Sequence, residues 1–167
     1  MMLQETYTLA NGVSIPKLGL GTWMITGPDC EQAVIEAIKM GYRHIDSAQD
    51  YGNEVEVGAG VRNSGVDRKD IFVTTKLAAQ YKTYEGAKAA IEESLQRLDI
   101  DYIDMVIIHS PQPWGEFGGN DRFAEGNLAA WRALEEAHDA GKIRAIGLSN
   151  FQQADVENIL ANCKEKP

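Results

Sequence analysis

Short apolar runs alternate with longer amphipathic stretches along most of this 167-residue chain. Four of the runs end at or next to Asp46, Lys76, His109 and Ser149, which follow one another at intervals of 30 to 40 residues. An interval of this length accommodates a strand, a crossover helix and the return to the next strand. The pattern therefore predicts consecutive βα units and a parallel sheet.

The amphipathic stretches carry apolar residues at helical spacing. The stretch after Thr83 is the clearest example, because Ala87, Ile91, Leu95 and Leu98 keep the 3.6-residue period. We predict strands over 18–21, 43–46, 71–76, 103–109 and 145–148. We predict helices from a capping box at Asp29 and Gln32 to Gly41, over 54–63, from Thr83 to Leu98, over 127–140, and after Asn150.

The first residues follow a different pattern. Asn11-Gly12 separates two short runs over 7–10 and 13–16, and an Asn-Gly pair in this setting is typical of a β-hairpin. We expect the hairpin to close one end of the core. The predicted fold class is thus α/β, a partial (β/α)8 TIM barrel with an N-terminal β-hairpin (7–16) followed by five βα units (18–167), and residues 1–167 form one domain.

Composition is that of a globular protein, with 44% hydrophobic and 25% charged residues. The formal net charge of −9 argues against a nucleic-acid or anionic-membrane partner. No apolar run approaches the roughly 20 residues of a membrane-spanning helix. The two cysteines, Cys30 and Cys163, have no metal-ligand or redox-pair spacing, so we expect free thiols and a cytoplasmic location.

The polar residues at the predicted strand ends are the candidate chemistry. In parallel barrels the carboxyl ends of the strands form the active site, so we expect Asp46, Tyr51, Lys76 and His109 to converge. A carboxylate, a phenol, an ammonium and an imidazole form an acid–base set rather than a metal cage, and we expect no metal site.

A phenol is normally a weak acid, with a pKa of about 10. A neighbouring ammonium stabilises its phenolate, and Lys76 is the candidate cation, held in turn by Asp46. A neutral His109 is expected to donate a hydrogen bond to a substrate oxygen. The set contains no hydride source, so the electrons must come from a cofactor, and we infer carbonyl reduction with a nicotinamide.

Several sequence stretches resemble one family. They are Gly19-Leu-Gly-Thr22, Gly41-Tyr-Arg-His-Ile-Asp-Ser-Ala48 with Asp50-Tyr-Gly-Asn-Glu54, Thr74-Thr-Lys76, Leu98-Asp99 with Tyr102-Ile-Asp104, His109, and Gly141 to Phe151. Together they resemble the aldo-keto reductases, in the bacterial small-carbonyl, diketogluconate-reductase-like branch. The resemblance covers essentially the whole chain.

The resemblance implies a role for each matching residue. Asp46, Tyr51, Lys76 and His109 would be the catalytic set, with Tyr51 as proton donor. Ser149, Asn150 and Thr22 would bind the cofactor, which is NADPH with NADH as the alternative, and Trp23 and Trp114 would contact a small carbonyl substrate. Trp114 lies in a long connection over 110–126, whose aromatic residues either line a pocket or pack the loop onto the barrel.

Family members also continue for three more βα units beyond the position of Pro167. Five strands alone have two open edges and an uncovered inner face, so we expect self-association. One alternative function is a catalytically inactive half-barrel that self-associates and binds cofactor weakly or not at all. Two further alternatives are a metal-dependent hydrolase using His44 and Asp46, and a Rossmann dehydrogenase using Gly58-Ala-Gly60.

Overall fold

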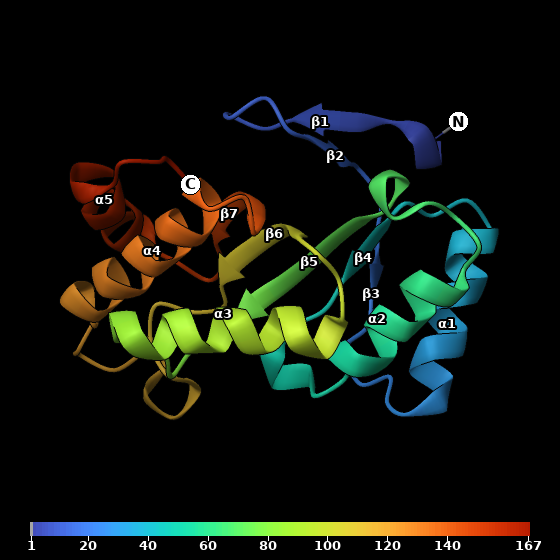
Figure 1. The fold of residues 1–167 in the computed structure, drawn as a ribbon. Helices are drawn as coiled ribbons and strands as arrows, with labels where there is room; N and C mark the ends of the chain where they lie inside the picture. The colour runs from blue at the N-terminus through green and yellow to red at the C-terminus, as the bar shows by residue number, and fades with distance from the viewer. Residues whose placement is uncertain (1) are drawn as a thin grey trace.

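The computed structural model of the chain describes residues 2–167, and a five-stranded parallel sheet forms its centre (Figure 1). The strands lie in the order β3-β4-β5-β6-β7, so each strand pairs with its neighbour in sequence. They are β3 (Leu20–Gly21), β4 (His44–Asp46), β5 (Phe72–Leu77), β6 (Ile103–Ile108) and β7 (Ile143–Leu148). This order is that of an arc of a TIM barrel, as predicted.

A helix follows each strand, which confirms the five βα units. The helices are α1 (Pro28–Lys39), α2 (Glu54–Asn63), α3 (Tyr84–Leu98), α4 (Ala124–Asp139) and α5 (Gln153–Asn162). Within residues 2–167, the 3-10 turns are η1 (Met2–Gln4), η2 (Gln49–Tyr51), η3 (Arg68–Asp70) and η4 (Trp114–Glu116). Helices α1 to α4 run along one side of the sheet (Figure 1). Among residues 2–167, no helix has the length and apolar character needed to cross a bilayer.

Alternation along the strands separates a face that packs against the helices from the opposite face. The register pairs Ile45 with Val73 and Val106 with Ile146, and these side chains belong to the core cluster that includes residues of all five helices. Lys76 on β5 is paired with Ile107 on β6, and Ile107 directly follows the core residue Val106. Because successive side chains point to opposite faces of a strand, Lys76 lies on the face away from the helices.

Several predicted element starts are wrong, and β7, for example, begins at Ile143 rather than at 145. The strand predicted over 18–21 is reduced to Leu20–Gly21, and the capping box at Asp29 and Gln32 does not form, because α1 begins at Pro28 after the uncapped Gly27. Helix α4 begins at Ala124 rather than 127. The side chain of Asn127 instead donates hydrogen bonds to the main-chain oxygens of Pro111 and Arg122, which fixes the preceding loop.

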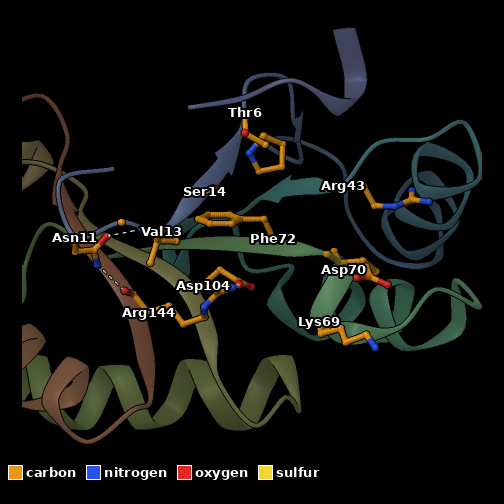
Figure 2. A pocket seen from close by; sticks show the side chains of 13 residues that line it. Thr6, Asn11, Val13, Ser14, Arg43, Lys69, Asp70, Phe72, Asp104 and Arg144 are labelled. Carbon is orange, nitrogen blue, oxygen red and sulfur yellow. Dashed lines mark hydrogen bonds and ion pairs between the residues drawn. The ribbon is translucent and has the colours of Figure 1, made fainter. Parts of the chain in front are cut away.

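The N-terminal hairpin is confirmed. Strands β1 (Thr6–Thr8) and β2 (Ser14–Pro16) are antiparallel, with Tyr7 opposite Ile15. The hairpin lies over the amino ends of the sheet strands, where the Asn11 side chain donates to the main-chain oxygen of Arg144 at 2.9 Å (Figure 2). Since Tyr7 is 62% exposed and a cavity of about 440 Å³ separates the hairpin from the strands, the hairpin covers this end without filling it.

Glycines in α2 explain the Gly58-Ala-Gly60 pattern. A Cβ at Gly58 would overlap the main-chain oxygen of Leu98, and one at Gly60 would lie 2.7 Å from Cβ of Val34. Both glycines therefore allow α2 to approach its neighbours closely. Their position inside a helix, together with the sequential strand order, excludes the Rossmann alternative.

We expect Gly58→Ala to lower the free energy of unfolding by about 1–3 kcal/mol, because the added methyl group forces α2 away from the end of α3. Urea unfolding followed by circular dichroism measures the effect. Gly115→Ala is the control, since a Cβ there meets no atom within 4 Å. Equal midpoints for the two variants would contradict the close approach.

Candidate active site

Lys76 lies at the centre of the predicted polar set. Its side chain is nearly buried and donates from Nζ to Asp46 Oδ2 at 2.6 Å and to the main-chain oxygen of Ser47 at 2.8 Å. Nζ also lies 5.0 Å from the centre of the Tyr51 ring. The ammonium is thus fixed by two oxygens from the end of β4 and placed beside the phenol.

His109 completes the set at the end of β6. Its main-chain N–H donates to the Leu77 oxygen at 3.0 Å, which places the residue beside the end of β5. The imidazole meets two rings edge to face, with ring centres 5.8 Å from Tyr51 and 5.0 Å from Trp114. The structure therefore brings the four predicted side chains to one edge of the sheet.

Tyr51 is positioned by the 3-10 turn η2. The Gln49 side chain accepts from the Ala78 N–H at 2.8 Å and donates to the Ala90 oxygen at 2.9 Å. It also donates to Ser94 Oγ at 2.8 Å. These bonds attach the turn to the end of β5 and to α3, and they thereby fix the main chain that carries the Tyr51 phenol.

Asn53 supports the site, and sequence reasoning gave it no separate role. Its buried side chain accepts from Ser47 Oγ at 2.7 Å and donates to the oxygens of Thr22 and Ile25 at 2.8 and 2.9 Å. Asn53 thereby connects the turn beside Lys76 to the loop that carries Trp23. Glu54, also buried, accepts from Thr75 Oγ1 and from Arg97 Nε. Buried polar side chains that are fully hydrogen-bonded hold neighbouring backbone rigid.

Ser149 and Asn150 follow β7 at the same edge. Asn150 has a φ of 60°, and its side-chain N–H groups donate to the His109 oxygen at 2.8 Å and to Ser149 Oγ at 3.0 Å. This arrangement leaves Asn150 Oδ1 and the Ser149 hydroxyl hydrogen without a partner within residues 2–167. One acceptor and one donor thus lie beside His109.

The remaining predicted residues differ in exposure. Thr22 is fully buried. Its main-chain N–H and its hydroxyl both donate to the main-chain oxygen of Asp46, so Thr22 stabilises the end of β4. Trp23 is 69% exposed and follows Thr22 in the chain, whereas Trp114 is 46% exposed and packs against His109. Their roles with cofactor or substrate stay predictions.

The long loop over 110–126 is internally fixed. Its buried Gln112 donates to the oxygens of Gly119 and Asp121 and accepts from Gly118 N. Arg122 forms a two-pronged ion pair with Asp155 at the start of α5. These bonds hold the loop in place, and its Trp114 contacts the site.

One acidic group and one basic group near the site, Asp50 and Lys82, have shifted pKa values. Contact with His109, and secondarily a hydrogen bond from Trp114, holds the pKa of Asp50 below its usual range against the effect of partial burial. Burial lowers the pKa of Lys82 to about 8. Lys82 donates to the Ser110 oxygen and to Asn127 Oδ1, each at 2.8 Å, and so fixes the start of the long loop.

His44 and Asp46 do not form the metal pair considered above. His44 Nε2 lies 2.9 Å from Thr74 Oγ1, and burial lowers the pKa of His44. Asp46 is engaged by Lys76. No group of three or more His, Cys, Asp or Glu side chains suited to a metal ion occurs within the described part of the chain.

Comparisons with known proteins agree with this architecture. The Aldo/keto reductase family profile matches residues 17–167. Glyoxal reductase of Bacillus subtilis is 43% identical over 166 residues, covering 99% of this chain and 56% of that protein. An aldo/keto reductase of Brucella melitensis superposes with a TM-score of 0.89 at 39% identity, covering 98% of this chain and 60% of that one.

A Bombyx mori aldo-keto reductase solved in complex with NADP superposes with a TM-score of 0.83 at 34% identity, covering 98% of this chain and 56% of that one. The chain spans a little over half the length of the curated relatives it matches. The family match extends over nearly the whole chain, and the five-unit parallel sheet agrees with the fold of these structures. The chain belongs to the aldo/keto reductase family of oxidoreductases.

Proposed function

We propose that this chain carries the catalytic half of an enzyme that reduces aldehydes and ketones to alcohols with NADPH, and that Tyr51 donates the proton. The observation that supports this most directly is the ammonium of Lys76, held by Asp46 at 2.6 Å and lying 5.0 Å from the centre of the Tyr51 ring. A cation in this position stabilises the phenolate that remains after proton transfer.

Asp46 and Lys76 act through Tyr51. The carboxylate and the Ser47 oxygen fix the position of Nζ, so the ammonium does not need to reorganise when charge develops on the phenol oxygen. His109, beside Tyr51, is placed to orient the carbonyl oxygen by donating an N–H. Phenol and imidazole together define where that oxygen lies.

Ser149 and Asn150 fit the carboxamide of a nicotinamide, which needs one donor and one acceptor. The Ser149 hydroxyl and Asn150 Oδ1 are the free groups of this pair. When bound, the nicotinamide supplies hydride to the carbonyl carbon. The NADP in the Bombyx mori structure supports NADPH as the cofactor, and NADH is the alternative to compare with it.

A small carbonyl compound is the proposed substrate. The exposed rings of Trp23 and Trp114 offer apolar contact at the rim of the site. The name of the Bacillus subtilis relative makes small dicarbonyl compounds such as methylglyoxal the first substrates to test.

We expect Tyr51→Phe to lower kcat for methylglyoxal reduction by about 10²-fold or more, because the proton donor is lost while the ring remains. NADPH consumption measures the rate, and quenching of protein fluorescence measures NADPH binding, which should be unchanged. Tyr7→Phe in the exposed hairpin is the matched control. A Tyr51→Phe variant with the parent rate would overturn the assignment of the proton donor.

The same experiment tests the alternative of an inactive half-barrel. If the folded 167-residue chain neither consumes NADPH with any aldehyde nor shows fluorescence quenching, that alternative replaces the proposal. Quenching without turnover would assign cofactor binding to the chain but not catalysis.

We also propose that the 167-residue chain self-associates through the open side of its sheet. Within residues 2–167, β3 pairs only with β4 and β7 only with β6. Beside β7 lies a cavity of about 430 Å³ lined by apolar side chains that include Met105, Ile107 and Leu148. Burying such a surface against a second copy removes apolar area from water.

We expect light scattering at tens of micromolar to give a mass above that of one chain. Ile107→Glu should shift the protein toward the monomer, because a carboxylate on this face resists burial. Leu160→Glu is the control, since Leu160 is exposed on α5. A monomeric parent chain would contradict self-association.

A further inference from the structure

The loop between β5 and α3, residues 78–83, has no role in the proposed reaction, but it contacts two segments that do. Near its start, the Ala78 N–H donates to the Gln49 side chain of η2 at 2.8 Å. Near its end, Lys82 Nζ donates to the main-chain oxygen of Ser110 at 2.8 Å. Because η2 carries the proposed proton donor and Ser110 is the first residue of the long loop, this short loop joins the two segments.

Asn127 extends the contact to the other end of the long loop. Lys82 Nζ also donates to Asn127 Oδ1 at 2.8 Å. The side-chain N–H groups of Asn127 donate to the main-chain oxygens of Pro111 at 2.9 Å and Arg122 at 3.1 Å. Ser110 and Asn127 are both buried, and hydrogen bonds in a low-dielectric interior are stronger than in water. One amine and one amide therefore hold the two ends of the long loop together.

The surroundings of Lys82 are those of a hydrogen-bond donor rather than of an ion-pair partner. Within residues 2–167 both acceptors of Nζ are neutral oxygens, and burial lowers the pKa of Lys82 to about 8. Asp155, the carboxylate that favours the ammonium, is itself paired with Arg122. A Cβ at Gly126 would lie 2.8 Å from Cβ of Lys82, so α4 reaches Lys82 only because residue 126 is glycine.

The long loop brings Trp114 to His109. Their ring centres lie 5.0 Å apart, with the ring planes at 88°. Trp114 Nε1 also donates to Asp50 on η2 at 2.9 Å. The two segments that residues 78–83 join therefore meet a second time, beside the imidazole. A displacement of the long loop moves Trp114 relative to both of these partners.

We propose that Lys82 and Asn127 are positioning residues for Trp114. By holding the two ends of the long loop, they keep the Trp114 ring against His109 and so limit the space left for the carbonyl substrate. Both act through the main chain of the loop and touch none of the reacting groups. The proposal rests on the proposed function, because the substrate it concerns is the proposed carbonyl compound.

The test is the indole N–H signal of Trp114 in the ¹H–¹⁵N spectrum of the purified chain, assigned with Trp114→Phe. Lys82→Met keeps the aliphatic side chain but removes both donated bonds, and it should shift or broaden this signal. Asn127→Asp keeps an acceptor for Lys82 but removes the donors to the long loop, and it should do the same. Lys69→Met, at a side chain 75% exposed, is the control and should match the parent.

Trp131 serves as an internal reference. It lies on α4 one turn after Asn127, and its Nε1 donates to Glu135 in the same helix at 3.1 Å. Its signal should keep the parent position in both variants, because α4 remains folded. An unchanged Trp114 signal in either variant would overturn the proposal. Equal displacement of the Trp114 and Trp131 signals would also overturn it, since the effect would then be a general loss of structure.

In an active protein, Lys82→Met should raise KM for methylglyoxal by about 10-fold and leave kcat nearly unchanged, because the proposed contact with Trp114 is lost equally in the ground state and the transition state. Fluorescence quenching by NADPH should match the parent. A fall in kcat at an unchanged KM would indicate loss of folded enzyme and would count against the proposal. The spectra need neither cofactor nor turnover, so failure of this proposal is distinct from failure of the proposed function.

Discussion

The ion pair between Lys76 and Asp46 is the interaction on which the site depends. An ammonium that is nearly buried is costly unless oxygens surround it, and Asp46 Oδ2 and the Ser47 oxygen satisfy that requirement. Both oxygens come from the end of β4, while Lys76 comes from β5. The pair therefore joins neighbouring strands at the point where the chain turns toward Tyr51.

The main-chain hydrogen bonds between strands stop at the carboxyl ends of the strands. Beyond that point, hydrogen bonds from polar side chains hold the loops around the Lys76–Asp46 pair. Asn53 joins the turn after β4 to the loop after β3, and Gln49 joins η2 to β5 and α3. Glu54 ties α2 to Thr75, the residue before Lys76. The edge that carries the candidate site is thus built from loops that have no regular secondary structure but are held by these hydrogen bonds.

The two ends of the sheet differ in character. At the amino end, the hairpin contacts the strands mainly through the Asn11 bond to Arg144, and the buried Asp104 is compensated by Arg68 and Arg144. At the carboxyl end, charged and polar groups are concentrated around His109, whose buried Nδ1 has no hydrogen-bond partner within residues 2–167. This division agrees with the rule that parallel barrels place stability at one face and chemistry at the other.

The order of elements, and the edge of the sheet at which the candidate side chains lie, follow from the amino-acid sequence alone. Apolar runs of strand length and helices of 3.6-residue period are local signals, and parallel strands necessarily bring Asp46, Lys76, His109 and Ser149 to one edge. Helix starts were predicted less well, because Gly27 and Phe123 begin α1 and α4 without a side-chain cap. The contact between Asp50 and Trp114, which are 64 residues apart and meet beside His109, is visible only in the folded chain. Such contacts depend on how a long loop folds back over the sheet, and no periodicity in the chain encodes that path.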